Sequence, residues 1–208
     1  MEEKKDLQKI TKKRLLAVEG KDEVSFFNEL FKHMGMEDIV DVQEVGGKDQ
    51  FKKKIPALKT IPGYSNLEAI AIIRDADESV ENTFKSVGGV LKESGLQTPK
   101  NPGEFSQGTP KVGVYIMPDN KNSGALETLC LRTVKDKKEM DCVKQFIDYA
   151  NRLENPPKEK DIDKAKVQAF LAIMPKVPDM LGIGSQKGYW DFDSPQLTPL
   201  REFLSELK

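Results

Sequence analysis

The stretch Ala69-Ile70-Ala71-Ile72-Ile73-Arg74-Asp75-Ala76-Asp77 decides the fold of this chain. An unbroken apolar run, rich in β-branched isoleucine, ends abruptly at charged residues. A continuous apolar run of this length, in contrast to an alternating one, is typical of a strand that is covered on both faces. Strands of that kind occur in parallel sheets between layers of helices. The stretch therefore predicts a buried parallel strand whose carboxyl end carries two aspartates.

Three further β-prone segments lie around this strand, at 15–18, 39–45 and 112–117. Segments with helical spacing of apolar residues separate them, the first starting near Asp22, which is placed to cap it. The order β-α-β-α-β-α-β argues for right-handed crossovers between parallel strands. We therefore expect an α/β fold with a mostly parallel four-stranded sheet flanked by helices.

After residue 124 the pattern becomes helical, interrupted by proline and by a Gly-rich stretch at 181–184 that indicates a turn. We expect one domain over residues 1–208, with an α/β core at 13–130 and a helical C-terminal extension at 131–208 packed on the core. The helices expected in this half lie at 124–134, 138–153, 161–174 and 197–207.

Composition restricts the classes of function. The 33 Lys and Arg residues nearly balance the 34 Asp and Glu residues, for a net charge of -1. Because proteins that bind nucleic acid through a broad electrostatic surface are usually basic, any such contact here must be local and metal-assisted. Cys130 and Cys142 have no zinc-type spacing and are expected to be reduced, packed thiols. With no signal peptide pattern and no membrane-length apolar run, we expect a cytoplasmic protein without a membrane partner.

Acidic residues follow three of the expected strands. Glu19 ends the first, Asp75 and Asp77 end the third, and Asp119 follows the fourth. The carboxyl ends of parallel strands meet at one edge, where open α/β sheets place their sites. Clustered carboxylates repel one another unless a cation compensates, and Mg²⁺ prefers such oxygen ligands. The chemistry that follows most naturally is metal-assisted phosphoryl transfer.

Two segments carry a family resemblance: Leu16-Ala17-Val18-Glu19-Gly20-Lys21-Asp22, and Ile72-Ile73-Arg74-Asp75-Ala76-Asp77. Together they resemble the signature of Toprim domains, a family that includes topoisomerases, primases, recombination proteins and OLD-family nucleases. The resemblance covers about residues 13–130, including the order of strands and helices. The segments 117–119, 124–127 and 187–193 further resemble small stand-alone Toprim-like proteins related to the OLD nucleases.

The resemblance implies roles for individual residues. Glu19 would be a general acid/base or a metal ligand, and Asp75 and Asp77 would hold Mg²⁺ or Mn²⁺. Glu127, with Asp119 as a further candidate, would complete a second metal position. The sequence lacks the ATPase, zinc-ribbon and tyrosine-nucleophile domains of larger family members, so it resembles the catalytic module alone.

Structural explanations stand beside these functional ones. The Asp75–Asp77 pair could form a turn before a helix, Asp119 could be a turn residue, and Glu127 could be a solvated charge in a first helical turn. Gly46-Gly47-Lys48 could cradle phosphate or form a tight turn. The aromatic pair Tyr189-Trp190 could serve a site or anchor the C-terminal segment.

Three functions remain open from the sequence. The first is a Mg²⁺- or Mn²⁺-dependent enzyme acting on phosphodiester bonds, most naturally a nuclease with nucleic acid as its partner. The second is a non-catalytic Toprim-like module that binds nucleic acid, nucleotide or a partner protein. The third is a phosphohydrolase for small phosphate esters, because a metal-binding strand edge does not specify the size of its substrate.

Overall fold

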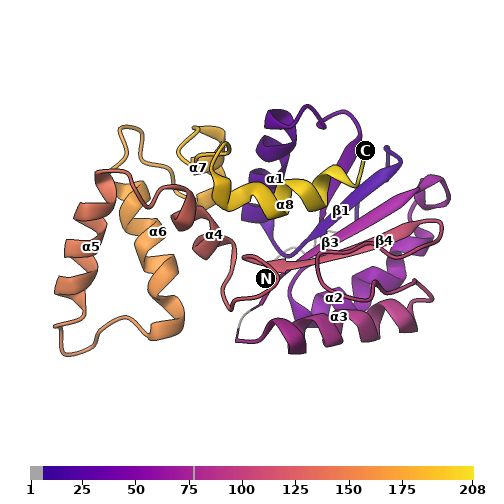
Figure 1. The fold of residues 1–208 in the computed structure, drawn as a ribbon, viewed down its shortest axis with the longest axis horizontal. Coiled ribbons are helices and arrows are strands. Elements are labelled where there is room, and N and C mark those ends of the chain that lie inside the picture. The colour runs from indigo at the N-terminus through magenta and orange to yellow at the C-terminus, as the bar shows by residue number, and fades with distance from the viewer. Residues whose placement is uncertain (1–6, 77) are drawn as a thin grey trace.

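A computed structural model describes residues 7–76 and 78–208. Within them, four strands form one sheet in the order β2-β1-β3-β4, and every neighbouring pair is parallel (Figure 1). The strands are β1 (Arg14–Val18), β2 (Val40–Glu44), β3 (Ala69–Asp75) and β4 (Lys111–Met117). The expected α/β fold with a four-stranded parallel sheet flanked by helices is confirmed.

The helices alternate with the strands up to β4 and then follow one another. They are α1 (Lys21–His33), α2 (Lys48–Ala57), α3 (Val80–Glu93), α4 (Leu126–Thr133), α5 (Glu139–Ala150), α6 (Ile162–Ala172), α7 (Leu181–Gln186) and α8 (Thr198–Ser205). Short 3-10 turns occupy Leu58–Thr60, Tyr64–Asn66, Glu159–Asp161 and Pro195–Leu197.

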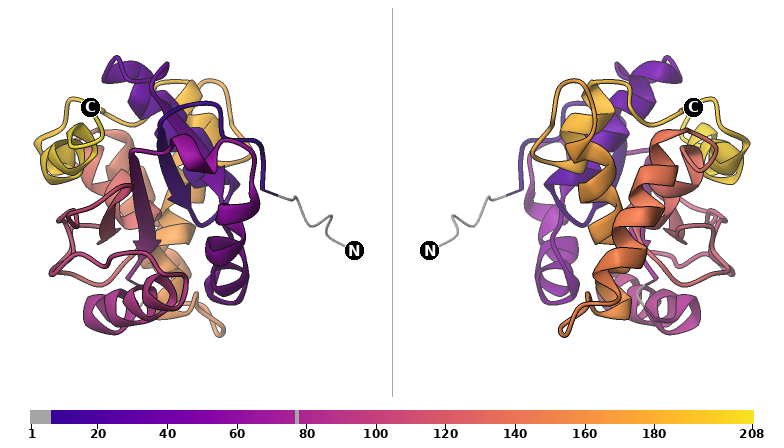
Figure 2. Two further views of the ribbon diagram at one scale, coloured as in Figure 1. Left: turned by 90° about the vertical axis from the view of Figure 1, so that its right-hand side faces the viewer. Right: turned by 90° about the vertical axis from the view of Figure 1, so that its left-hand side faces the viewer.

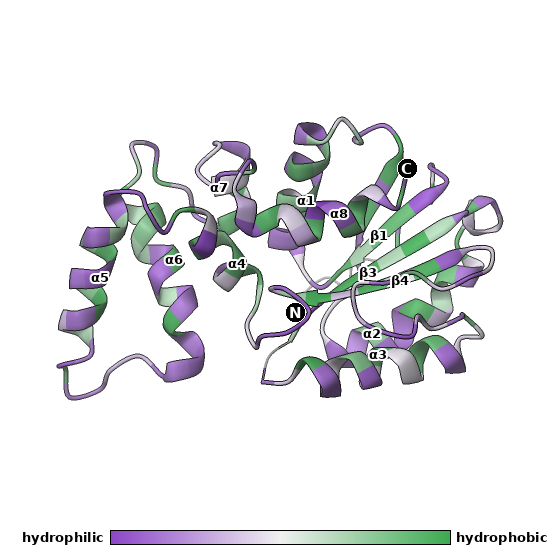
Figure 3. Ribbon diagram, in the orientation of Figure 1, coloured by the Kyte–Doolittle hydropathy of each residue, from purple (hydrophilic) through white to green (hydrophobic). Residues whose placement is uncertain are grey.

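Side-chain alternation along β3 builds two apolar cores, one on each face of the sheet. Ile70 and Ile72 belong to the core that includes α2 and α3, whereas Ala71 and Ile73 belong to the core that includes α1, α4 and α8. All four are at most 1% exposed. Figures 1 and 2 show the sheet between these helical layers. Figure 3 shows that the strands are the most continuously apolar part of the molecule. The apolar run thus has the double burial that its composition predicts.

Helices α5 and α6 pack against each other beyond the carboxyl ends of the strands (Figure 1). The inner side of α5 carries Met140, Val143 and Ile147, which join the core, while Cys142 lies on the other side and is exposed. The prediction of two packed thiols is therefore correct for Cys130, which is buried, and wrong for Cys142. Helical periodicity separates Cys142 from the inner face, although its neighbour in sequence is buried.

The Gly-rich stretch expected to be a turn forms α7 instead. A Cβ on Gly182 would lie 2.5 Å from the Cβ of Ser25, so this glycine permits α7 to approach α1 closely. The backbone N–H of Gly182 donates to Oδ1 of Asp22 at 2.7 Å. Asp22 is therefore not the cap of its own helix, which has Gly20 at the N-cap, but an acceptor for the first turn of α7.

None of the helices in the described residues combines the length and the hydropathy needed to cross a bilayer.

Candidate functional site at the carboxyl edge of the sheet

The carboxyl ends of β3 and β4 are joined to the segment that leads into α4. The backbone N–H of Ala76 donates to the carbonyl oxygens of Met117 at 3.1 Å and of Gly124 at 3.0 Å. These bonds hold three segments side by side: the end of β3 with Asp75, the end of β4, and the start of α4 with Glu127. The segments that carry Asp75 and Glu127 and the end of β4 thus meet at one edge of the sheet.

Glu19 follows β1 at this edge and is held by an arginine from β3. Oε2 of Glu19 lies 3.0 Å from a guanidinium nitrogen of Arg74. Arg74 is only 7% exposed, and it also donates to the carbonyl oxygen of Gly46 at 2.6 Å and lies over the ring of Phe51. A planar guanidinium fixed on three sides keeps one orientation, so Glu19 is positioned rather than free to rotate.

The position of Glu19 also bears on the two glycines that begin α2. A Cβ on Gly47, the N-cap of α2, would lie 3.3 Å from Oε1 of Glu19. The negative carboxylate therefore lies at the positive end of this helix, where a phosphate would otherwise be favoured. Gly46 has φ +78°, which favours glycine and matches a tight turn, and a Cβ there would lie 2.6 Å from the Cβ of Gln50. The tight-turn explanation of Gly46-Gly47-Lys48 is the one that this geometry favours.

Glu23, in the first turn of α1, is a carboxyl group of the edge whose pKa the surroundings shift strongly. Burial is the largest cause that raises its pKa, from 4.5 to about 7, and a backbone hydrogen bond opposes the rise. The negative charges of Glu19, Glu127 and Asp22 raise it further. The carboxyl groups of Glu19, Asp22 and Glu127 therefore lie close enough to Glu23 for their charges to act on it.

The same negative charges also act on the buried thiol of Cys130 in α4. Burial raises the pKa of Cys130 well above its usual value, and the charges of Glu127, Asp22 and Glu23 add to the effect. Cys130 lies three residues after Glu127 on α4, so it faces the same side of that helix. A buried neutral thiol of this kind is a packing residue and a poor nucleophile.

Asp119 is enclosed by donors from its own loop and from α4. Oδ1 accepts from the backbone N–H groups of Lys121 and Asn122, and Oδ2 accepts from Asn122 and from Arg132 at 2.6 Å. Burial alone would raise its pKa, but these hydrogen bonds hold it at about 2. A carboxylate with this many donors orders the loop after β4, which is the turn role weighed from the sequence.

The other predicted ligands have distinct positions. Asp75 ends β3, and alternation places it with Ile73 on the face of the sheet that α1 and α4 cover. Glu127 lies in the first turn of α4. The start of α4 is fixed because Oγ1 of Thr128 accepts from the N–H of Ala125 and donates to Asp163 of α6 at 2.8 Å. Asp77 lies outside the described residues.

A donor set made of carboxylates suits a hard divalent cation. The raised pKa of Glu23 indicates excess negative potential at the edge, which such a cation would offset. Within residues 7–76 and 78–208, no three Asp, Glu, His or Cys side chains are already arranged to hold a metal ion. The residues thus fit Mg²⁺ or Mn²⁺ by their chemistry, and the ligand roles of Glu19, Asp75, Asp77, Asp119 and Glu127 stay predictions.

Sequence reasoning missed two residues of this edge. Glu23 lies in the first turn of the helix that follows Glu19, which keeps it near the strand end, yet an acid in a first turn also has an ordinary dipole role. Arg74 interrupts an otherwise apolar strand, which is a signal that a buried guanidinium needs a carboxylate partner. Both signals are present in the sequence but have no unique interpretation without the fold.

The aromatic pair near the C-terminus anchors the chain. Trp190 is 2% exposed, stacks on Phe170 with ring centroids 5.3 Å apart, and donates through Nε1 to the carbonyl oxygen of Leu181. The hydroxyl of Tyr189 donates to the carbonyl oxygen of Lys176. Of the two sequence interpretations, the anchoring role is the one that these contacts support.

The fold is similar to that of the C-terminal region of the Xanthomonas campestris pv. campestris OLD protein. Its mercury-phased structure has a TM-score of 0.50 at 14% sequence identity, with 95% of each chain covered. The iodine-phased structure has a TM-score of 0.49 at 15% identity, again with 95% of each chain covered. At such identities the likeness concerns the fold alone.

A comparison with curated proteins found no match. Residues 13–208 match the sequence profile of a family described as "Protein of unknown function (DUF3226)". That match spans nearly the whole chain, and the chain belongs to this family.

Proposed function

We propose that this protein is a Toprim-like, Mg²⁺- or Mn²⁺-dependent enzyme that processes phosphodiester bonds, acting as a nuclease on nucleic acid. The observation that carries the proposal is the convergence of carboxyl groups at one strand edge, with the pKa of Glu23 raised to about 7. The Toprim resemblance of the segments around Glu19 and Asp75 supports it, and so does the fold shared with the OLD C-terminal region.

In this proposal Asp75, Asp77 and Glu127 hold the metal, with Asp119 ordering the loop beside them. A bound Mg²⁺ would polarise a phosphodiester oxygen and offset charge that develops on it. Arg74 orients Glu19 through their ion pair, and Glu19 is placed to accept or donate a proton at the same edge. Glu23, with a pKa of about 7, can share that role, because a general acid/base acts best when its pKa is near the working pH.

The test is a nicking assay on supercoiled plasmid and on single-stranded RNA with Mn²⁺. Asp75→Asn keeps the shape of the side chain but weakens a metal ligand, so cutting should fall by two orders of magnitude or more. Asp148→Asn on α5, which is exposed and away from the strand ends, should cut at the wild-type rate. Equal thermal stability of the two variants in EDTA separates a chemical loss from a folding defect.

Full cutting by Asp75→Asn, or cutting that persists in excess EDTA, would overturn the proposal. Small phosphate esters tested beside DNA and RNA separate a nuclease from a phosphohydrolase. A preference for the esters would assign the site to that third function.

A non-catalytic binding module is the second candidate. The observation in its favour is that Arg74 neutralises Glu19, the predicted acid/base. This candidate expects binding of nucleic acid or nucleotide in EDTA that survives Asp75→Asn, with no turnover under any metal.

A further inference from the structure

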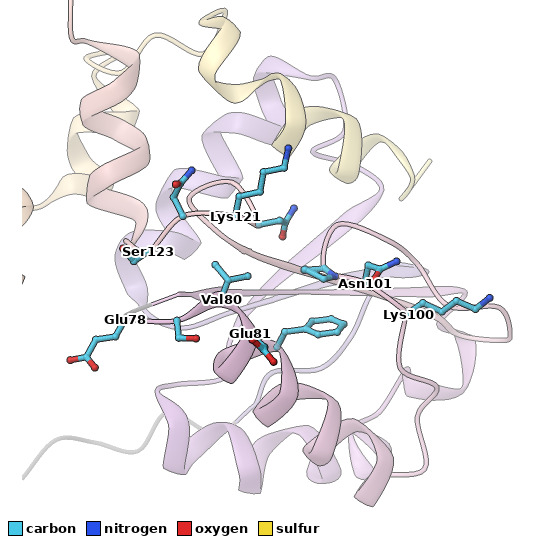
Figure 4. Close-up of a pocket in the computed structure, with 12 residues that line it drawn as sticks. Glu78, Val80, Glu81, Lys100, Asn101, Lys121 and Ser123 are labelled. Carbon is cyan, nitrogen blue, oxygen red and sulfur yellow. The ribbon is translucent and has the colours of Figure 1, made fainter.

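A pocket of about 630 Å³ lies beside the acidic edge, and the proposed chemistry leaves it unassigned. Figure 4 shows its walls: the first turns of α3 below, the loop after β4 with Lys121 above, and the segment with Lys100 and Asn101 at one side. Its volume is in the range of sites for small organic ligands. Because α3 follows β3 and the loop follows β4, the pocket adjoins the end of β3, where Asp75 lies, and the end of β4, which Asp119 follows.

Two cations in the lining are available to a ligand. Among the described residues, the ammonium groups of Lys100 and Lys121 have neither a hydrogen bond nor an ion pair. Lys121 is presented by an ordered loop, because its backbone N–H donates to Asp119 and the next residue does the same. A cation on a pre-organised loop loses less conformational entropy when it binds an anion than one on a mobile loop.

The rest of the lining is not that of a simple anion site. Phe84 contributes an aromatic ring, and Glu78 and Glu81 contribute carboxylates that can accept hydrogen bonds from amino groups. A bare phosphate or polyphosphate would be repelled by Glu81 and would gain nothing from the ring. A nucleotide unit uses all three features: phosphates for the lysines, a base face for Phe84, and an exocyclic amine or sugar hydroxyl for Glu81.

We infer that this pocket binds one nucleotide unit of a single-stranded nucleic acid whose neighbouring phosphodiester extends to the acidic edge. The inference rests on the proposed function, because it specifies the substrate of that site as a single strand. Glu78 and Glu81 balance the charge of Lys100 and Lys121 in the lining, so the phosphate contacts are local ones made by the two ammonium groups.

The experiment measures binding without turnover. The probe is a 5′-fluorescein-labelled oligodeoxycytidylate of about 12 nucleotides, a length within known single-strand site sizes. Fluorescence anisotropy is recorded in EDTA across a salt series. The double variant Lys100→Ala/Lys121→Ala should bind at least tenfold more weakly, and the slope of log K against log salt should fall by about 1.4, or about 0.7 for each lost phosphate contact.

The matched control is Lys52→Ala/Lys53→Ala on the exposed side of α2, which removes the same charge outside the pocket. This control should change binding less than twofold. Phe84→Leu keeps an apolar side chain but removes the ring, and it should weaken binding about fivefold without a change in the salt slope. Equal losses in the two lysine variants would overturn the inference, because binding would then be unspecific.

Two further outcomes are decisive. In the first, unlabelled cytidine monophosphate displaces the labelled strand at equal affinity per nucleotide. This result would assign the pocket to a free nucleotide and overturn the inference that its ligand is a single-stranded nucleic acid. Failure of all proteins to cut with Mn²⁺, together with selective loss of binding in Lys100→Ala/Lys121→Ala, would reject the nuclease and uphold the pocket. If the wild type cuts and Lys100→Ala/Lys121→Ala binds as tightly as the wild type, the nuclease proposal is upheld and the pocket inference is rejected.

Discussion

At the scale of single residues, Glu23 records how the fold sets the charge of the edge. Its pKa is raised to about 7 by burial first, and by neighbouring carboxylates second. The folded state therefore holds the proton more tightly than the unfolded state does between pH 4.5 and about 7. The contribution of this group to stability is complete below about pH 4.5 and is lost as the pH rises through 7.

Glu23→Gln should remove this dependence, because glutamine has no proton to lose. The quantity to compare is the unfolding free energy of the variant minus that of the wild type, both measured in EDTA. This difference should be larger at pH 8 than at pH 4.5 by on the order of 2 kcal/mol. Urea unfolding at the two pH values measures the difference. Parallel pH profiles of the two proteins would show that Glu23 titrates normally, and the argument for excess negative potential at the edge would fail.

At the scale of secondary-structure elements, α7 depends on a close approach to α1. The Cβ that Gly182→Ala adds would lie 2.5 Å from Ser25, with the carbonyl oxygen of Asp22 at 3.1 Å. We expect the variant to lose about 2–3 kcal/mol of unfolding free energy, because packed helices must separate. The hydrogen bond from Gly182 to Asp22 would weaken at the same time.

Gly89→Ala in α3 is the matched control. A Cβ there meets nothing within 4 Å, so the substitution should raise the unfolding free energy by about 0.5–1 kcal/mol through helix propensity. Urea unfolding of both variants under one set of conditions measures the pair. A stable Gly182→Ala protein would mean that α7 is not held against α1 in solution.

The contrast between β3 and α7 shows what the sequence can predict. The apolar run at 69–73 has one low-energy solution, a strand covered on both faces, so its place in a parallel sheet follows from composition. In the stretch at 181–184, glycine's freedom suggests a turn, whereas its small size is what the fold uses. Local chemistry does not distinguish the two uses, because the deciding neighbour, Ser25, is distant in sequence.

The candidate site divides in the same way. The positions of Glu19, Asp75 and Asp119 after parallel strands follow from topology, and the structure brings these strand ends to one edge. The hydrogen-bond and ion-pair partners of these side chains cannot be predicted from topology. Whether a carboxylate meets Arg74, Arg132 or other carboxylates depends on loop geometry, which the spacing of residues does not encode.

At the scale of the whole molecule, α8 ties the C-terminus across the sheet to the edge opposite the site. Phe203 stacks on Phe105 with centroids 4.8 Å apart and contacts Tyr115 of β4. Beyond the helix, the guanidinium of Arg14, the first residue of β1, donates to the carbonyl oxygen of Leu207 at 2.9 Å. One face of the sheet is therefore covered by a segment that lies far along the chain from the strands it packs on.

Phe203→Ala should lower the unfolding free energy by about 3–4 kcal/mol, because a ring that is 4% exposed would leave a cavity between α8 and β4. Phe203→Leu, which keeps most of the volume, should lose less than half of that. Phe146→Ala on α5 is the matched control: this ring is 58% exposed, so its removal should cost no more than about 0.5 kcal/mol. If urea unfolding gave the two alanine variants equal losses, α8 would not be part of the cooperative core that covers this face of the sheet.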